Sequence, residues 1–274
     1  MGKITEYTKV SRFDKDDVLL KDGAAGTKTI TAANAALSLA DLISPINHRN
    51  IIPKRSLGSG VTSAQKTAIQ NGTFDNLFVG DYWTIGGVTY RIADMDYWLY
   101  CGDTSLTKHH LVIVPDAPLY NAQMNTENVT TGGYTGSKMY TENLEQAKTT
   151  IQNAFGDLLL TRREYLTNAV TNGYPSGGAW FDSSVELMNE IMVYGTHVYA
   201  PANNGTIIPN KYTTCKQQLA LFRLDPTRVN PTRAWYWLRD VVSSAHFASV
   251  NGYGVAGFYG ASISGGVRPV FAIG

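Results

Sequence analysis

The side chains best suited to catalysis or metal binding are scattered along the chain. Five histidines are present, and none lies in an HExxH, GxSxG or P-loop motif: His48, His109, His110, His197 and His246. His109 and His110 are neighbours in a strand-like segment, so their rings point to opposite faces and do not readily hold one ion. The histidines therefore predict neither a metal site nor an identifiable catalytic base.

Two other groups of side chains contain residue types that could have a chemical role. Asp94 and Asp96 share one face of a predicted strand, as a carboxylate pair would, but a solvated hairpin end also explains them. Cys101 and Cys215 are isolated, so they form neither a CxxC metal site nor a disulfide framework. We expect both cysteines to be structural, and a single bridge between them stays open. The sequence predicts no cofactor and no enzymatic activity.

The composition favours a neutral surface that forms hydrogen bonds. The 274 residues carry a net charge of +1 and only 16% charged residues, whereas Gly (26) and Tyr (16) are plentiful. A net charge near zero gives no long-range attraction to nucleic acid or to an anionic membrane. No apolar stretch reaches the roughly 18 residues of a membrane span, and no signal peptide is recognised. We therefore expect synthesis in a host cytoplasm and no membrane insertion.

The first 45 residues predict a small module. Strands at 17–20 and 28–30 flank a turn-rich segment, and a short helix at 32–40 follows with Thr31 as its cap. The stretch DDVLLKDGAAGTKTITAANAALSLAD resembles the N-terminal segments of bacteriophage tail-fibre and baseplate proteins, which anchor a distal domain to the virion. The resemblance implies a virion-anchoring or oligomerisation module at 1–45, a linker at 46–60 and a ligand-binding domain at 61–274.

The larger domain mixes helices and strands. Two capping boxes are predicted, at Thr62 with Gln65 and at Ser183 with Glu186. The expected elements are a helix at 63–71, a hairpin at 79–93, a strand at 110–114, and helices at 143–155, from Thr161, and at 185–192. A helix-bearing middle between strands is an α+β pattern, and we expect the last strand to pair with an early one.

The closing part of the chain has an unusual composition. Residues 241–267 contain no Lys, Arg, Asp or Glu. Within them, small residues from Val250 to Ala256 alternate with a mixed set, so a strand would have one face for packing and one for display. A Gly-rich edge strand that merely closes a sheet would have the same pattern. Just before this run, Trp235 and Trp237 predict a core anchor that touches no ligand, with Arg239 paired to an acidic neighbour.

The closing segment also resembles a known family. The sequence WLRD, the run rich in Gly, Ala and Ser, and GVRPVFAIG are similar to the C-terminal half of the C-type-lectin-fold variable proteins of diversity-generating retroelements. In that family a reverse transcriptase substitutes bases at template adenines, and the resulting codons cannot encode Lys, Gln, Glu, Met or Trp. None of these five occurs in residues 241–267, although a Gly-rich strand could also lack them.

The resemblance implies a C-type-lectin-like domain of the formylglycine-generating-enzyme-like superfamily, with a variable region at about 237–268. The constant scaffold would comprise Trp237, Leu238, Arg239, Phe247, Ala248, Val250, Gly252, Gly254, Ala256, Ala261, Ser262, Ser264, Val267, Arg268 and Pro269. The changeable, ligand-facing positions would be Ser244, His246, Ser249, Asn251, Tyr253, Val255, Gly257, Phe258, Tyr259, Gly260, Ile263 and Gly265.

Motifs of related proteins are missing. The Glu-Pro-Asn, Gln-Pro-Asp and Trp-Asn-Asp motifs of calcium-dependent lectins do not occur, so neither calcium nor sugar binding carries over from them. Cys101 and Cys215 match no motif of the formylglycine-generating enzymes.

The two resemblances together imply a receptor-binding protein at a phage tail tip. It would be carried on the virion, contact other tail or baseplate proteins, and form a homotrimer. Its closing run would present changeable side chains to a bacterial surface receptor, either a protein or a glycan. An alternative is a structural baseplate or decoration protein whose run packs between subunits. An enzyme of the sulfatase-modifying type is a third option, for which no nucleophile or base is identifiable.

Overall fold

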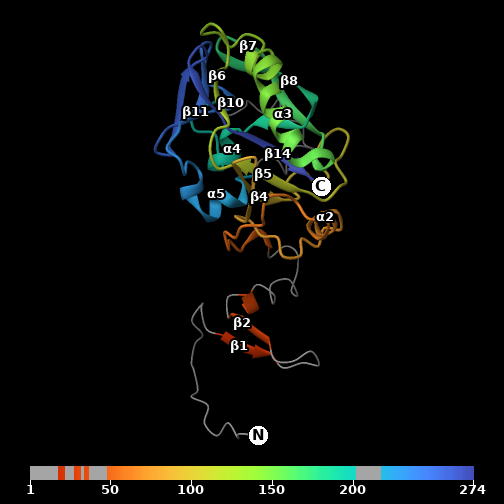
Figure 1. Ribbon diagram of the computed structural model, residues 1–274. Helices are drawn as coiled ribbons and strands as arrows, with labels where there is room; N and C mark the ends of the chain where they lie inside the picture. The colour runs from red at the N-terminus through yellow and green to blue at the C-terminus, as the bar shows by residue number, and fades with distance from the viewer. Residues whose placement is uncertain (1–17, 22–27, 32–33, 37–47, 202–216) are drawn as a thin grey trace, which may run out of the picture.

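The computed structural model describes residues 18–21, 28–31, 34–36, 48–201 and 217–274 (Figure 1). In the first part, β1 (Val18–Lys21) and β2 (Lys28–Thr31) form an antiparallel hairpin, which confirms the two predicted strands. Residues 34–36 form a helical turn, and the Asn34 N–H donates to Thr31 Oγ1 over 3.2 Å, as expected of a cap. The rest of the predicted helix at 32–40 lies outside the described residues.

Two five-stranded sheets form the centre of the larger part. The first sheet is antiparallel and has the order β3 (Tyr82–Ile85), β4 (Val88–Met95), β5 (Leu111–Pro115), β14 (Pro269–Ile273) and β9 (Val185–Leu187). The second has the order β12 (Ala256–Gly260), β11 (His246–Val250), β10 (Tyr236–Val241), β13 (Ser264–Val267) and β6 (Tyr120–Gln123). In the second sheet β10 and β13 run parallel, and the other neighbours run antiparallel.

The end of the chain joins the two sheets. β13 belongs to the second sheet and β14 to the first, and a single residue, Arg268, separates them. β14 is buried along its whole length and pairs with β5 through Phe271 and Ile113. This pairing confirms that the last strand joins an early one, and Figure 1 shows β14 beside β5 in the middle of the larger part.

Helices complete the α+β fold. They are α2 (Ser63–Gln70), the π-helical turn η2 (Met139–Asn143), α3 (Leu144–Phe155), the 3₁₀ turns η3 (Gly156–Leu158) and η5 (Pro226–Arg228), α4 (Glu190–Tyr194) and α5 (Ala220–Leu224). α2 has the predicted capping box, in which the Gln65 N–H donates to Thr62 Oγ1 and the Thr62 N–H donates to Gln65 Oε1. α3 buries the predicted apolar face, formed by Leu144, Ala147, Ile151 and Phe155.

The helix predicted from Thr161 is wrong. A long hairpin occupies this part of the chain, formed by β7 (Arg162–Thr171) and β8 (Tyr174–Ser183). Asn172 and Gly173 at its turn have φ values of 51° and 81°. Positive φ at both central residues is typical of a two-residue hairpin turn, and Asn-Gly is the pair that favours it most. This dipeptide was the local signal for a hairpin.

The helix predicted over 185–192 begins later than expected. Ser183 Oγ donates to the Glu186 carboxylate over 2.7 Å instead of capping a helix. The residues after it form β9, whose partner is the distant strand β14. The helix, α4, then begins after Asn189, whose side chain accepts a hydrogen bond from the Met192 N–H. Pairing with β14 therefore overrides the local helix signal.

The segment predicted as a linker is in part built into the domain. His48 is buried, and its ring stacks on Phe78 with centroids 4.4 Å apart. Farther along, the Leu57 N–H donates to the Tyr82 carbonyl at the edge of β3 over 2.7 Å. The described residues 48–60 thus extend the first sheet because their backbone groups and apolar side chains find partners there.

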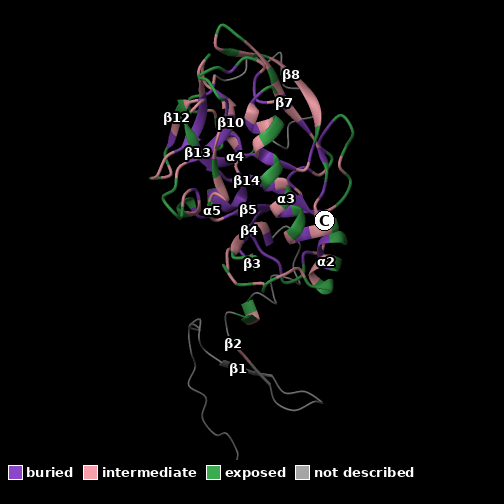
Figure 2. Ribbon diagram, turned by 45° about the horizontal axis from the view of Figure 1, so that its top comes forward, coloured by how far each residue is buried: buried purple, intermediate pink, exposed green. Residues whose placement is uncertain are grey.

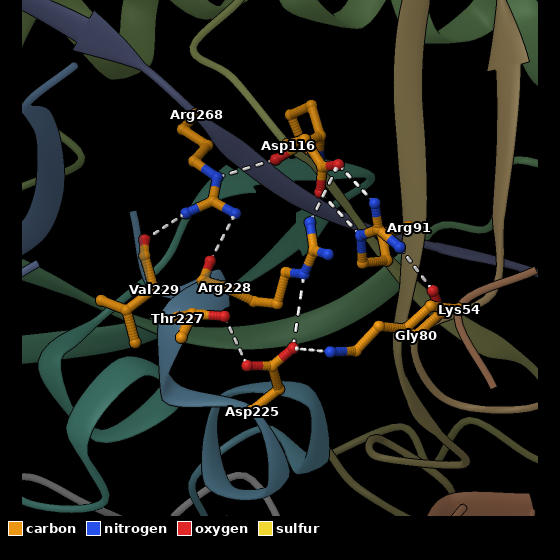
Figure 3. A network of polar contacts seen from close by, with 10 residues as sticks. Lys54, Gly80, Arg91, Asp116, Asp225, Thr227, Arg228, Val229 and Arg268 are labelled. Carbon is orange, nitrogen blue, oxygen red and sulfur yellow. Dashed lines mark hydrogen bonds and ion pairs between the residues drawn. The ribbon is translucent and has the colours of Figure 1, made fainter. Parts of the chain in front are cut away.

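Ion pairs fix the segment that leads into β10 (Figure 3). Asp225 Oδ2 lies 2.7 Å from Lys54 Nζ and 3.4 Å from Arg228 Nε. Burial raises the pKa of the Asp225 carboxyl, but hydrogen bonds from Lys54 and Thr227 and the charge of Arg228 lower it to about 2. The ionised carboxylate therefore holds η5 in place. This turn precedes β10 in the chain.

The helices of the described part include none that is both long and apolar enough to cross a membrane.

Candidate functional site

The acidic residues considered for chemistry have structural partners. Asp94 is fully buried, where it accepts hydrogen bonds from Arg49 Nε over 2.5 Å and from the Ala220 N–H over 3.0 Å. It is therefore not at a solvated hairpin end, as one explanation held. Asp96 is bonded to His109, whose Nδ1 lies 2.8 Å from Asp96 Oδ2. The two carboxylates do not form a pair that shares a proton.

The histidines and the described cysteine also lie in structural settings. His110 is buried beside Trp98, and its Nε2 accepts a hydrogen bond from the Trp98 N–H over 3.1 Å. Burial lowers the pKa of this histidine, which favours the neutral ring. Cys101 is buried, and Cys215 lies outside the described residues. Within the described ranges, no three His, Cys, Asp or Glu side chains are placed to hold a metal ion.

The aromatic block before the closing run anchors the second sheet. Trp237 is fully buried, and its indole N–H donates to the Ala122 carbonyl on β6 over 3.0 Å. Arg239 is buried as well and pairs with Glu164 Oε2 at 3.2 Å. Both predicted structural roles are confirmed. Trp235 differs because it is half-buried and its ring contacts Tyr259, with centroids 4.5 Å apart.

The closing run folds into a hairpin instead of one alternating strand. β11 ends at Val250, a turn occupies residues 251–255, and β12 returns beside β11 in antiparallel register. The Asn251 side chain closes the turn by accepting hydrogen bonds from the N–H groups of Tyr253 and Val255. The predicted split of the run into one display face and one packing face is therefore wrong, because the turn interrupts the alternation.

β12 is the edge strand of the second sheet, and it includes exposed residues (Figure 2). Phe258 and Tyr259 are consecutive, so they point to opposite faces of the sheet. Their side chains are nevertheless 43% and 40% exposed. We call residues 251–263, which comprise β12 and the turns on either side of it, the rim. The positions predicted to change can therefore be exposed on the rim without sharing one parity.

The predicted changeable positions differ in exposure. Those that are exposed are Ser244, Tyr253, Val255, Phe258, Tyr259 and Ile263, and those that are half-buried are His246, Asn251, Gly257 and Gly260. Ser249 and Gly265 are buried, so the prediction that they face a ligand is wrong in this structure. Among the predicted constant positions, Ser264 is exposed and Gly252, Gly254 and Ser262 are half-buried, whereas the others are buried.

The rim carries two groups of aromatic rings. In one, Tyr259 lies against Trp235 and Trp237. In the other, Phe258 lies 5.3 Å from His246 and 5.1 Å from Tyr199, a residue outside the closing run. Tyr199 and Trp235 were not predicted as surface contacts, and no sequence motif links either of them to the run. Tyr199 lies in the segment 198–200 and Trp235 comes directly before β10, so their positions follow from how these two segments pack.

A groove lies beside the turn of the rim. It has a volume of about 590 Å³, and its lining includes Tyr194, Arg223, Asn230 and Tyr253. The Asn230 side chain donates to the Asn251 carbonyl over 2.7 Å, which fixes the turn to one wall of the groove. Tyr253 is the most exposed of the described large hydrophobic side chains, at 87%. The rim therefore lies next to a groove.

A substitution at Gly265 tests directly whether this predicted ligand-facing position is buried. A Cβ atom added at this glycine would overlap the indole ring of Trp235. We expect Gly265→Tyr to displace that ring and to lower the free energy of unfolding by about 1 to 3 kcal/mol, the usual range for overpacking. Gly257→Tyr is the matched control, because its Cβ would meet only Ser249 Oγ at 3.3 Å. Chemical denaturation should show a smaller loss for the control, and equal losses would contradict the assignment.

The fold and this surface define a class: an α+β protein with an uncharged, aromatic-rich rim at the edge of a sheet. No family model, curated protein or solved structure matches the chain.

Proposed function

We propose that this chain is a phage tail receptor-binding protein. Its larger part would be a C-type-lectin-like domain of the formylglycine-generating-enzyme-like superfamily, diversified by a retroelement. The rim would carry the changeable side chains that bind a bacterial surface receptor. One observation carries the proposal: most positions predicted as constant are buried, whereas most positions predicted as changeable reach the surface around β12.

The position of the rim supports side-chain exchange. β12 is held to β11 by backbone hydrogen bonds, which do not depend on side-chain identity. Exposed side chains at an edge strand and its turns can change with little effect on the core, and most surface substitutions alter stability by no more than about 0.5 kcal/mol. The scaffold below remains fixed through Trp237 and Phe247, which are fully buried.

The residue types on the rim also suit recognition of varied partners. Tyr253, Phe258 and Tyr259 supply large contact area with few rotatable bonds, while Ser, Asn and Gly adapt through small side chains. Antibody loops use the same combination. The N-terminal module at 1–45 would attach the protein to other tail or baseplate proteins, and a homotrimer would present several rims on one virion. Multiple copies raise the overall affinity without new contacts.

Sequencing of the gene in a phage population tests the proposal. We expect substitutions to concentrate at the codons of the exposed rim residues Tyr253, Val255, Phe258, Tyr259 and Ile263, and to be rare at buried positions. Tyr100 is the control, because its side chain is 70% exposed but lies outside the run. If surface exposure alone decided which codons vary, the Tyr100 codon would vary as often as those of the rim. Under the proposal, it should not.

Two results would count against the proposal. Substitutions spread evenly along the gene would exclude targeted diversification. A rim as constant as the buried scaffold would favour the structural alternative, a baseplate or decoration protein in which the rim packs between subunits.

A further inference from the structure

A segment outside the closing run adds an aromatic ring to the rim. Residues 198–200 lie beside β12, where the Tyr199 ring meets the Phe258 ring at an angle of 68°. Phe258 in turn meets the His246 ring at 83°. Tyr199 is 46% exposed, much like Phe258, so the two rings form one continuous patch of surface. This patch combines a residue predicted to change with one that lies far from the run.

A buried carboxylate holds this segment in place. Glu190 is fully buried, and its two oxygens accept hydrogen bonds from three successive backbone N–H groups, at 2.8 Å from Val198, 2.9 Å from Tyr199 and 3.1 Å from Ala200. Three hydrogen bonds to one buried side chain fix the backbone of this segment. The Glu190 N–H also donates to Asp240 Oδ2 over 2.6 Å, which ties the arrangement to β10.

The same short helix also holds the turn of the rim. Glu190 begins α4 and Tyr194 ends it, and the Tyr194 hydroxyl donates to the Gly254 carbonyl over 3.2 Å. Residues 198–200 and the turn at 251–255 are therefore both fixed to α4. Since the bonds to the turn use backbone atoms, the distance between Tyr199 and the rim is maintained when rim side chains change.

The chemistry of the patch favours a protein as its partner. Most of the exposed large hydrophobic side chains in the described residues lie on the rim or in the adjoining segment: Val198, Tyr199, Tyr253, Val255, Phe258, Tyr259 and Ile263. The run itself has no Lys, Arg, Asp or Glu. Aromatic enrichment and depletion of charge are typical of the centre of a protein–protein interface. Within the patch, the Phe258 ring meets the Tyr199 and His246 rings edge to face.

We infer that Tyr199 is a fixed contact residue for a protein receptor and that Glu190 is its positioning residue. The inference rests on the proposed function, because it takes the rim as the binding surface. Each diversified variant keeps this one aromatic contact and changes the side chains around it. A fixed ring beside changeable ones gives every variant a common anchor, since buried tyrosines often dominate binding energy.

A library built on the full chain tests the inference. Ser244, Tyr253, Val255, Tyr259 and Ile263 are randomised, Phe258 is kept, and binders are selected against lysozyme as a protein probe and dextran as a glycan probe. In clones that bind lysozyme, we expect Tyr199→Ala to weaken binding at least tenfold in surface plasmon resonance. Tyr100→Ala, which removes another exposed tyrosine, should change binding less than twofold.

Glu190→Gln separates positioning from general stability. We expect the same loss of lysozyme binding as for Tyr199→Ala, and no additional loss in the double variant, because Glu190 acts through Tyr199. Amide exchange at residues 198–200 should accelerate in Glu190→Gln. Losses that add in the double variant would show that Glu190 does not act through this ring.

The possible failures are distinguishable. Lysozyme binders that ignore Tyr199→Ala would overturn the inference and leave the proposed function standing. Binders that depend on Tyr199 but arise only against dextran would overturn the protein class of the partner. A Tyr199→Ala variant that dissociates from an oligomer into single chains would place the ring between copies instead. A library without binders to either probe would count against the proposed function itself.

Discussion

Arg268→Ala is expected to lower the free energy of unfolding by about 3 to 5 kcal/mol, the largest effect of any single change considered for this chain. The Arg268 guanidinium is 1% exposed and donates to three backbone carbonyls: Pro115 at 2.7 Å, Val229 at 2.5 Å and Arg228 at 3.1 Å (Figure 3). Alanine would leave these acceptors without their donor in a buried site. Each unsatisfied buried group costs about 1 to 3 kcal/mol, and the separate costs are not fully additive.

The position of Arg268 explains why its loss would affect both sheets. It is the single residue between β13 and β14, and its guanidinium lies 5.0 Å from the centre of the Tyr236 ring on β10. Urea denaturation of the variant measures the loss. Arg223→Ala is the control, since this arginine is exposed on α5 and its replacement should change stability by less than about 0.5 kcal/mol. Similar midpoints for the two variants would contradict the assigned role.

Asp240→Asn is expected to stabilise the protein above pH 6 and to have little effect near pH 4. Burial raises the pKa of the Asp240 carboxyl to about 6 from its ordinary value of 3.8, and the nearby Glu190 adds to the rise. His197 and Arg239 act in the opposite direction. Between pH 3.8 and about pH 6, the Asp240 carboxyl carries a proton in the folded chain but not in the unfolded chain. The free energy of unfolding therefore falls as the pH rises through this window, by about 3 kcal/mol in total.

An asparagine at this position does not ionise, so the variant avoids this loss. Its Oδ1 atom can still accept the hydrogen bond from the Glu190 N–H. Thermal unfolding from pH 4 to pH 8 should show a midpoint that rises above that of the native chain as the pH increases from about 4, and the gain should level off above about pH 6 at several degrees. Asp182→Asn removes a charge from an exposed site and serves as the control. A gain that is constant across the pH range would show that titration of Asp240 is not its cause.

Local signals predicted several elements correctly. The capping box of Thr62 and Gln65, the Gly86–Gly87 turn and the apolar face of α3 depend on residues within a few positions of one another. The structure agrees with these short-range signals. Trp237 and Arg239 were also predicted as anchors, since large aromatic and paired charged residues on a strand seldom lie free at the surface.

Local signals failed where a distant partner decided the structure. Residues 185–187 pair with β14, a strand far along the chain, and this pairing outweighs the cap-like Ser183. Gly265 was assigned to the ligand-facing set by its place in the family pattern, yet the Trp235 ring covers it. Ser249 is buried on β11, which has a neighbouring strand on each side.

The sequence by itself determined the α+β class and the uncharged closing run. These follow from residue types and short-range patterns. Only the tertiary structure decided that β12 is an edge strand, that both of its faces reach solvent, and that Tyr199 joins the rim. The edge position of β12 depends on strand order. Tyr199 is held by the hydrogen bond from its N–H to Glu190, and its contact with Phe258 joins residues far apart in the chain.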